Sequence, residues 1–271
     1  MRVHAVPRPK VPRLSVSVAY DAIAASYDEQ VRGDDWMRRA LHAHYARVFQ
    51  PGQRVLDVGC GTGIDAIALA RLGVSVVGID GSAAMIQRLN EKVAAGGLTS
   101  LIQTRVLRIQ DLGDLAGQRF DGAVSAFASL SSLPDLAGFA RDAARLVRPG
   151  GRLVLHLLNR FSLWEFLGYV ARQDFASASR VGHVRQRTFV IGGQPVLHSV
   201  YFADEAYRRF FATSFRRQDT YSLGALRPPH TVRRLPARLI NALEWLDVRA
   251  GRWPVVRDAG RFFVLDLERL T

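Results

Sequence analysis

Cysteine is nearly absent from this chain of 271 residues, which contains only Cys60. A single cysteine cannot form a disulfide within the chain, so a fold held together by disulfides is excluded. The histidines of most interest, His156, His183, His198 and His230, have no carboxylates at metal-ligand spacing. We therefore expect no metal site.

Long apolar runs are also missing. No run reaches the ~18 residues that a membrane-spanning helix needs. The N-terminal residues 1–18 are basic and contain prolines, but no continuous apolar stretch of the kind found in secretory signals. These features predict a flexible basic arm over residues 1–18 and a cytoplasmic protein without a transmembrane segment.

Lysine is the third scarce residue. Lys10 and Lys92 are the only lysines among 37 basic residues, and the others are arginines. The formal net charge of +13 would otherwise suggest a nucleic acid or an anionic membrane as partner. A GC-rich coding sequence produces the same replacement of lysine by arginine, so we discount the charge as a binding signal. Its distribution is uneven, with a net charge of +4 over residues 1–150 and +9 over residues 151–271.

What the chain does have is a strand that runs into three alternate glycines. Residues 55–63 read VLDVGCGTG, and the helical pattern IDAIALARL follows at once. Gly59, Gly61 and Gly63 allow positive φ angles and a close approach of backbone N–H groups to a ligand. A strand, a glycine turn and a helix N-terminus together form the nucleotide-binding turn of open α/β sheets. Asp57, just before the glycines, is a carboxylate that needs a partner if it is buried.

Acidic residues follow two further strand patterns. The run VSVVGID (74–80) ends in Asp80, where a carboxylate can accept both hydroxyls of a ribose. The run LIQTRVLRI (101–109) leads into Gln110 and Asp111. Open sheets bind their ligands at the carboxyl ends of the strands, so these acids predict the ligand-binding edge.

These motifs, in this order, resemble those of the class I S-adenosylmethionine-dependent methyltransferases. The resemblance covers roughly residues 19–158, and the matching stretches are AYDAIAASYD (19–28), VLDVGCGTG (55–63), VVGID (76–80), IQDLGDL (109–115), FDGAVSAFASL (120–130) and LVRPGGRLVL (146–155). It implies an α/β fold with a Rossmann-like, mostly parallel seven-stranded sheet flanked by helices. It also implies S-adenosylmethionine as the cofactor.

The resemblance further implies which residues hold the cofactor. Gly59, Gly61 and Gly63 would wrap its methionine part, and Asp57 would orient the ammonium group. Asp80 would bind the ribose and Asp111 the adenine amino group. The remaining expected cofactor contacts are Tyr20 and Tyr27, which would close over the site, and Gly81, Gln110, Leu112 and Phe127. Gly81 departs from the family, which often has a larger apolar residue there, so the packing of the adenine stays open.

An NAD-type dehydrogenase is the alternative for a glycine loop followed by an acid. Its G-x-G-x-x-G fingerprint needs a glycine at the sixth position, whereas this loop reads GCGTGI. A carboxylate at Asp57 would repel a pyrophosphate. Asp111 and the PGG turn at 149–151 have no counterpart in that fingerprint. The loop therefore favours the methyltransferase interpretation.

Periodicity divides the chain into parts. Residues 20–50 have a helical pattern, and strands alternate with helices from 53 to 158, which predicts a parallel sheet covered on both faces. We expect a cofactor-binding core over 19–160, a substrate cap insertion over 161–225, and a C-terminal helix with closing strands over 226–271. The run RFFVLDLERL (261–270) is expected to be the closing edge strand.

The predicted cap lies where small-molecule methyltransferases resembling this chain have an insertion, after the fifth strand. It begins with the apolar segment FSLWEFLGYVAR (161–172). Two strand-like runs, 184–191 and 195–202, are joined by Gly192, Gly193 and Gln194, which predicts a β-hairpin. A helix over 203–215 follows.

The acceptor is predicted from what these segments contain and lack. The turn that amino-methylating nucleic-acid enzymes carry, Asn/Asp-Pro-Pro-aromatic, is replaced here by SAFASLSS, and no cysteine is placed for cytosine chemistry. Aromatic residues in the cap region suggest a small, largely apolar or aromatic acceptor, methylated on oxygen, nitrogen or carbon. If that acceptor must lose a proton, His156 or Tyr201 is the expected catalytic base. The alternative for His156 is a hydrogen-bonded core histidine.

Two further functions stay open at this point. The basic C-terminal half could bind RNA for methylation, although no recognition module is visible and nucleic acid is not the expected partner. The chain could also be a non-catalytic scaffold that only binds the cofactor. The oligomeric state, a homodimer included, is not fixed by the sequence.

Overall fold

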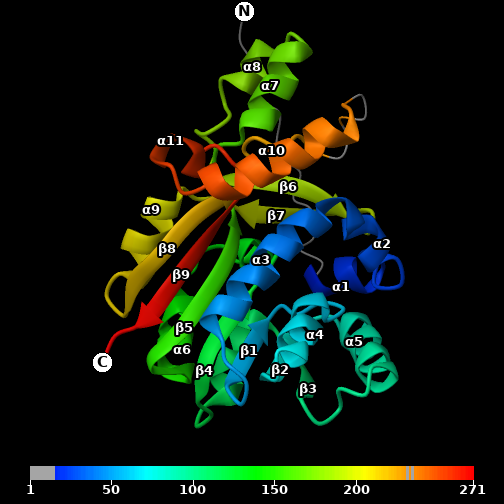
Figure 1. Cartoon of the computed structure of the whole chain (residues 1–271), viewed down its shortest axis with the longest axis vertical. Helices are drawn as coiled ribbons and strands as arrows, with labels where there is room; N and C mark the ends of the chain where they lie inside the picture. The colour runs from blue at the N-terminus through cyan, green and yellow to red at the C-terminus, as the bar shows by residue number, and fades with distance from the viewer. Residues whose placement is uncertain (1–15, 230–231, 233–234) are drawn as a thin grey trace, which may run out of the picture.

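A computed structural model of the protein describes residues 16–229, 232 and 235–271. Its centre is a seven-stranded sheet with the strand order β3-β2-β1-β4-β5-β9-β8 (Figure 1). The strands are β1 (Arg54–Val58), β2 (Ser75–Asp80), β3 (Ile102–Val106), β4 (Phe120–Ser125), β5 (Val147–Leu158), β8 (Phe215–Leu223) and β9 (Phe262–Arg269). The first five run parallel, and β9 pairs antiparallel with both β5 and β8. The predicted α/β fold is confirmed.

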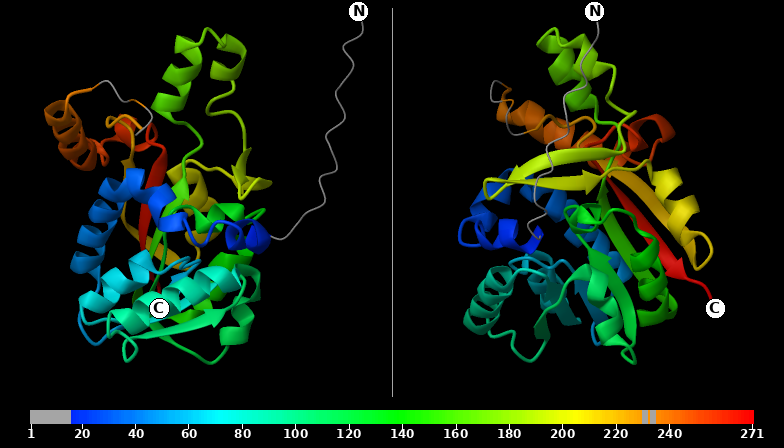
Figure 2. Two further views of the ribbon diagram at one scale, coloured as in Figure 1. Left: turned by 90° about the vertical axis from the view of Figure 1, so that its right-hand side faces the viewer. Right: turned by 180° about the vertical axis from the view of Figure 1, so that it is seen from behind.

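Helices cover both faces of this sheet (Figure 2). One face packs on α3 (Asp35–Val48), α4 (Ile64–Arg71) and α5 (Ala83–Ala95), and the other on α6 (Ala137–Leu146), α9 (Ala203–Ala206) and the short helical turns η2 (Ile109–Leu115) and η4 (Tyr207–Phe211). Because side chains alternate along a strand, Leu56 and Val58 of β1 point to the α6 face, while Val55 points to the α3 face. Asp57 therefore shares the α3–α4 face with Val55.

Helix α3 is fixed to the sheet by a buried polar cluster. His44 Nε2 lies 2.8 Å from Asp266 Oδ2 on β9, and Arg152 of β5 donates two hydrogen bonds to the same carboxylate. A buried carboxylate is costly unless it is paired, so these partners hold Asp266 and α3 together.

The N-terminal helical region is broken where the sequence pattern predicted one continuous stretch over 20–50. It consists of α1 (Val16–Asp21), α2 (Tyr27–Val31), the turn η1 (Arg32–Asp34) and α3. Most of the predicted basic arm, residues 1–15, lies outside the described part of the chain. Its last residues, 16–18, already belong to α1, so the predicted boundary is corrected there.

The C-terminal half adds α7 (Leu163–Ala171), α8 (Phe175–Ala178) and an antiparallel hairpin of β6 (Gln186–Ile191) and β7 (Gln194–Ser199). The hairpin confirms the prediction, and its turn residues Gly192 and Gly193 have φ angles of 55° and 75°. Figure 1 shows these elements with α10 (Ala237–Ala250) and α11 (Pro254–Arg257) beyond the carboxyl ends of the parallel strands.

Two expectations for this half are wrong. β8 pairs with β9 along its length, so the segment Phe215–Leu223 belongs to the sheet and not to a cap over 161–225. β9 lies between β5 and β8, so β8 is the edge strand and the C-terminal run is internal. In the segments 16–229 and 235–271, no helix has the length and apolar character needed to cross a membrane.

Candidate active site

The glycine loop connects β1 to α4 through left-handed backbone. Gly59, Gly61 and Gly63 have φ angles of 71°, 53° and 82°. A Cβ on Gly63 would lie 2.0 Å from Leu89 Cδ1, and one on Gly59 would lie 2.5 Å from Ser129 Cβ. A Cβ on Gly61 would have Tyr27 Cε1 as its nearest neighbour, at 3.9 Å. Two glycines are therefore required by packing, while Gly61 borders open space.

The carboxylate of Asp57 is buried below this loop without a full set of partners. Asp57 is 1 % exposed, and its Oδ2 atom has no hydrogen-bond partner. Burial, followed by the nearby carboxylates of Asp65 and Asp80, raises its pKa well above the ordinary value. An orphaned buried carboxylate beside a glycine loop fits an ammonium group of a ligand, which would restore its ionised form.

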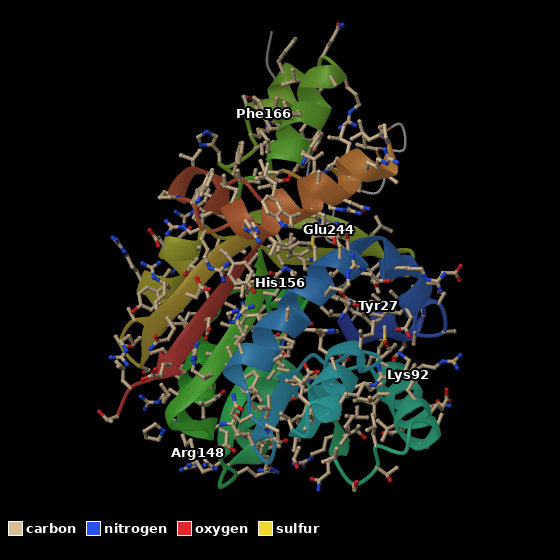
Figure 3. The ribbon with its side chains drawn as sticks, in the orientation of Figure 1. Tyr27, Lys92, Arg148, His156, Phe166 and Glu244 are labelled. Atoms are coloured by element: carbon tan, nitrogen blue, oxygen red, sulfur yellow. The ribbon has the colours of Figure 1, made fainter. Side chains whose placement is uncertain are left out.

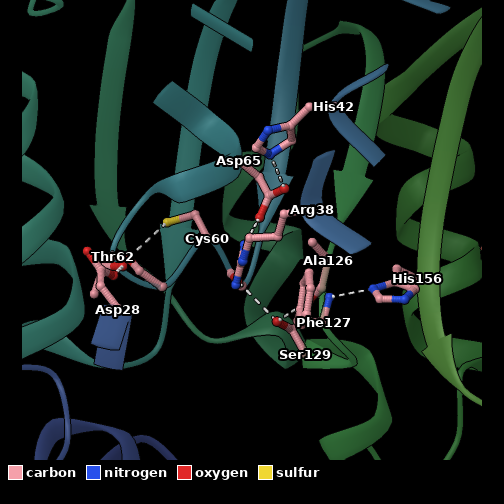
Figure 4. A network of polar contacts seen from close by, with 12 residues as sticks. Asp28, Arg38, His42, Cys60, Thr62, Asp65, Ala126, Phe127, Ser129 and His156 are labelled. Atoms are coloured by element: carbon pink, nitrogen blue, oxygen red, sulfur yellow. Dashed lines mark hydrogen bonds and ion pairs between the residues drawn. The ribbon is translucent and has the colours of Figure 1, made fainter. Parts of the chain in front are cut away.

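Arg38 of α3 lies next to the glycine loop (Figure 4). Sequence reasoning did not predict it as a site residue. Its guanidinium, on a residue 5 % exposed, donates to Asp65 Oδ2, and it lies 4.0 Å from the ring centroid of Phe127. His42 Nε2 is 3.0 Å from the other oxygen of Asp65. Burial alone would raise the pKa of Asp65, but Arg38 and His42 outweigh it and hold that pKa below its usual value. The site therefore contains one buried cation that a ligand carboxylate could share with Asp65.

Asp80 joins the end of β2 to the glycine loop. Its Oδ2 atom accepts a hydrogen bond from Gly61 N at 2.9 Å, and its Oδ1 atom accepts one from Ser82 N at 2.8 Å. The structure therefore brings Asp80 to the loop, as the ribose assignment requires. A Cβ on the following Gly81 would lie 3.4 Å from Arg108 Cγ, so the Arg108 stem is next to this position.

The residues expected at the adenine are more dispersed. Asp111, on η2, forms an ion pair with Arg108, whose Nε lies 2.7 Å from Asp111 Oδ2, and this partner lowers its pKa. Gln110 is exposed, whereas Leu112 is buried in the core on the α6 face. Asp111 lies at the solvent side of the site with its carboxylate already paired.

Helices α1 and α2 close over the loop and are attached to it by two aspartates. Asp28 accepts a hydrogen bond from Thr62 Oγ1 and pairs with Lys92, which also donates to Thr62 O at 3.0 Å. Asp21 Oδ1 accepts from Ser82 Oγ at 2.5 Å. These contacts place the α1–α2 pair as a cover over the loop.

The aromatic residues of this cover lie together. Tyr20 and Tyr27 pack edge to face with ring centroids 6.4 Å apart, and Tyr27 borders the hollow between the loop and Arg38. Figure 3 labels Tyr27 at the N-terminal helices and Lys92 below it. This hollow has a volume of only about 20 Å³. The hollow by itself is too small to hold a whole nucleoside.

A second and much larger cavity, of about 710 Å³, borders Trp36 and Met37 in the first turn of α3, whereas the hollow borders Arg38. Its walls come from four segments that are far apart in the sequence: the start of α3, the region from the end of β5 through β6, the loop 224–229, and Arg261. Its lining includes four aromatic side chains (Trp36, Trp164, Tyr169, Phe189) and six charged ones (Asp34, Glu165, Arg180, Arg187, Arg227, Arg261).

The hollow and the cavity are neighbours. Met37 lines the cavity and the next residue, Arg38, lines the hollow. Phe127, which lines the hollow, has its ring centroid 5.8 Å from that of Phe262, and Phe262 directly follows the cavity residue Arg261. The walls of the two spaces are therefore built from neighbouring residues.

The predicted bases do not lie at either space. His156 is 1 % exposed, accepts a hydrogen bond from Phe127 N at 3.2 Å through Nδ1, and has its pKa lowered to about 3 by burial. Tyr201 is buried in the core on the α6 face, with its ring centroid 5.5 Å from that of Phe210. Neither lines the hollow or the cavity, so the geometry favours the core alternative for His156. His230 lies outside the described residues.

Comparison with known proteins agrees with this geometry. Residues 55–151 match a family model described as a methyltransferase domain. A ubiquinone biosynthesis O-methyltransferase from Xanthomonas oryzae pv. oryzae is 42 % identical over 118 residues, which covers 42 % of this chain and 47 % of that protein. The chain thus spans about half the length of the curated relatives it matches.

Solved structures share the fold over most of the chain. The CcbJ methyltransferase from Streptomyces caelestis aligns with a TM-score of 0.63 at 19 % identity, covering 95 % of this chain and all 100 % of that one. An S-adenosylmethionine-dependent methyltransferase from Listeria monocytogenes, described as putative, aligns with a TM-score of 0.58 at 14 % identity, covering 85 % and 98 % of the two chains. At such identities the likeness shows the fold alone.

Motifs, sheet order and family match lead to one assignment. Residues 55–151 match a methyltransferase domain, and the motifs and sheet order around them agree with the class I S-adenosylmethionine-dependent type. The cofactor of the domain is S-adenosylmethionine, as the sequence predicted.

Proposed function

We propose that this protein transfers the methyl group of S-adenosylmethionine to a small, largely apolar or aromatic acceptor held in the 710 Å³ cavity. The observation that carries the proposal is the position of this cavity, whose wall is built from residues next to those of the glycine-loop hollow. Its size falls in the range of about 300–1,000 Å³ that is usual for small-ligand sites. The similarity to O-methyltransferases of ubiquinone biosynthesis supports a small molecule as acceptor.

Asp57 below the loop and two residues of the hollow, Arg38 and Gly61, fit the amino-acid end of the cofactor. Asp57, with its unpaired Oδ2, would accept the ammonium group. Arg38 would bind the carboxylate, for which it would partly leave Asp65. Gly61 allows close approach because its Cβ position is open. These three groups complement the two opposite charges of the amino-acid end.

The nucleoside end would extend from Asp80 toward η2. Asp80 would accept the ribose hydroxyls, with its bonds to Gly61 N and Ser82 N holding the carboxylate in place. Asp111 would reach the adenine amino group after rotation from Arg108, and Gln110 and Gly81 would border the base, whereas the side chain of Leu112 lies in the core. Tyr20, Tyr27 and Phe127 would close over the cofactor.

The residues around the cavity would orient the acceptor. Methyl transfer from a sulfonium is an in-line displacement in which the carbon–sulfur bond breaks as the bond to the acceptor atom forms. Orientation in a dry site supplies as much as ~7–11 kcal/mol to such a reaction. The segment from α7 through the β6–β7 hairpin would serve as the cap that excludes water, and its hairpin turn reaches α1, where a Cβ on Gly192 would lie 2.4 Å from Ala19 O.

The test begins with the cofactor and its demethylated product. We expect calorimetry to show S-adenosylhomocysteine binding with a Kd of about 10 μM or tighter without added metal, and no comparable binding of NADH. Incubation with methyl-labelled cofactor and a cell extract should transfer label to an organic-extractable, low-mass fraction. A labelled product that nuclease degrades would replace this proposal with the RNA alternative. Binding without transfer to any fraction would favour the scaffold.

A further inference from the structure

The wall of the 710 Å³ cavity has more cations than anions. Two of its arginines have carboxylate partners within the wall: Arg187 pairs with Glu165, and Arg261 NH1 lies 3.0 Å from Asp34 Oδ2. The other two, Arg180 and Arg227, have no such partner among the cavity residues. They leave an excess of positive charge in an otherwise aromatic space.

Arg227 is the more enclosed of these two arginines. Its side chain is 15 % exposed, and its Nε atom lies 3.5 Å from Glu244 Oε2 without forming a hydrogen bond. Glu244 is engaged more closely by Arg39, at 2.7 Å. The Arg227 guanidinium also lies 4.9 Å from the Trp36 ring centroid, a cation–π distance. Its charge is held in place but is not neutralised by a carboxylate of its own.

The loop that carries Arg227 is fixed by a buried aspartate of α10. Asp247 accepts hydrogen bonds from Gly224 N at 3.0 Å, Leu226 N at 2.6 Å and Arg227 N at 2.8 Å. Three convergent bonds to one carboxylate set the backbone of this loop before any ligand arrives. Arg227 is therefore presented to the cavity from a rigid support.

Unpaired donors surround the same space. The indole N–H groups of Trp36 and Trp164 and the Nε–H groups of Arg187 and Arg227 are buried without acceptors among the described residues. Trp36 is 3 % exposed. The guanidinium of Arg180 has no ion-pair partner among the described residues. Its electrostatic interaction with the carboxylate of Asp174 is long-range. The surplus of positive charge makes this wall complementary to anionic oxygens, and the buried donors would gain acceptors only if the wall adjusts to a ligand.

We propose that the acceptor carries an anionic oxygen group, a carboxylate or a phosphate, that binds Arg227 and Arg180 while its apolar body contacts the cavity's aromatic side chains. This inference rests on the proposed role of the cavity as the acceptor site. Arginine forks bind carboxylate and phosphate oxygens through paired N–H groups, which gives both affinity and orientation. The anionic group fixes one end of the acceptor, so that its nucleophilic atom faces the layer formed by Met37 and Phe127.

The test compares two anionic probes, each with an uncharged counterpart that has the same aromatic ring. We would titrate the protein with 4-hydroxycinnamate and its primary amide, and with phenyl phosphate and phenol, by calorimetry and by tryptophan fluorescence, since Trp36 and Trp164 line the cavity. At least one anion should bind about tenfold or more tightly than its neutral counterpart, and the preferred anion tells carboxylate from phosphate. Arg227→Gln and Arg180→Gln should each reduce that ratio to about threefold or less.

Arg238→Gln is the matched control, because Arg238 is an exposed arginine of α10 that does not line the cavity. It should keep the wild-type ratio. Arg180 is exposed, so its variant tests the proposal even if Arg227→Gln fails to fold. Equal binding of anion and neutral probe by the wild type, no saturable binding of either anion, or a ratio that survives both cavity variants would overturn the proposal.

The same samples separate this inference from the proposed function. S-adenosylhomocysteine should bind all four proteins within about twofold of one another, because neither arginine lines the glycine-loop hollow. Cofactor product that binds normally with no preference for anionic probes would refute the anionic subsite alone. Wild-type protein that fails to bind the product would refute the proposed function.

Discussion

The two halves of the site differ in how they are built. The cofactor hollow takes most of its lining from one short stretch, the loop from β1 into α4, and its volume is about 20 Å³. Tyr27 of α2, Arg38 of α3 and residues 126–129 after β4 complete it. The acceptor cavity measures about 710 Å³ and is assembled from four separated segments. The core of the proposed cofactor site is thus encoded in one stretch of sequence, whereas no single stretch dominates the proposed acceptor space.

The charges differ as well. At the hollow, the carboxylate of Asp65 pairs with the buried cation Arg38, and the carboxylates of Asp57 and Asp80 lie nearby. Around the cavity, arginines exceed acids. S-adenosylmethionine carries positive charge on its sulfonium and ammonium groups, so an acidic hollow suits the donor and a basic cavity suits an anionic acceptor. If both proposals hold, each half repels the ligand of the other by charge.

The largest expected effect tests the packing of the cofactor half. Gly63→Ala places a Cβ 2.0 Å from Leu89 Cδ1 at a φ of 82°, whereas Gly52→Ala has a φ of 83° and no atom within 4 Å. We expect unfolding in urea to show a loss of about 2–4 kcal/mol for the first variant and about 1 kcal/mol for the second. Equal losses would mean that backbone strain, and not the contact with Leu89, requires glycine at position 63.

A smaller effect separates the two ligands. Asp80→Ala removes the partner of two ribose hydroxyls, each of which costs about 1–3 kcal/mol when left unpaired. Calorimetry should therefore show at least a tenfold weaker affinity for S-adenosylhomocysteine. Probe binding in the acceptor cavity should stay unchanged, since Asp80 does not line it. Unaltered product affinity would remove Asp80 from the site.

The acceptor half should respond in the opposite way. Trp164→Ala removes an aromatic wall of the cavity, so kcat/KM for the acceptor should fall about tenfold while the affinity for S-adenosylhomocysteine stays within about twofold. Tyr201→Phe is the control, because its hydroxyl lies away from the cavity. A loss of turnover in Tyr201→Phe with normal cofactor binding would restore Tyr201 as the base.

The smallest effect at neutral pH concerns His156. Its pKa of about 3 in the folded protein is below the ordinary value near 6.5, so the unfolded chain binds one more proton between these values. This contribution to stability is complete above pH ~6.5 and is lost as the pH falls, with a slope of about 1.4 kcal/mol per pH unit. His156→Gln, whose amide oxygen can still accept from Phe127 N, should make the dependence of unfolding free energy on pH shallower by that amount. If the variant leaves the slope of unfolding free energy against pH unchanged, His156 is not buried in its neutral form. If kcat of the wild type rises through pH 6.5 and the variant loses that rise, His156 is a catalytic base.

Sequence patterns located the cofactor half because its signals are local. Asp57, the glycines and Asp80 lie at strand ends that any parallel α/β sheet brings to one edge. Arg38 was missed because nothing near residue 38 marks it; it meets Asp65 only after α3 packs across α4. The same reason hid Arg227, which depends on Asp247 from another helix.

The misplaced strand had a signal that could have been used. Residues 262–267 of β9 are buried on both faces, and the run FFVLDL is almost continuously apolar. Such a run is typical of an internal strand, whereas an edge strand is expected to alternate. The break of the N-terminal helix at residues 22–26 had no comparable signal, since its position is set by contacts of Asp21 and Asp28 with distant residues.

The most direct test of the two-site account is a crystal structure with S-adenosylhomocysteine bound. We predict that its amino-acid end lies over Gly61 between Asp57 and Arg38, and its ribose at Asp80. Its sulfur should face the layer of Phe127 and Met37, with the 710 Å³ cavity directly beyond. A product molecule inside that cavity, or a sulfur that faces away from it, would contradict the account.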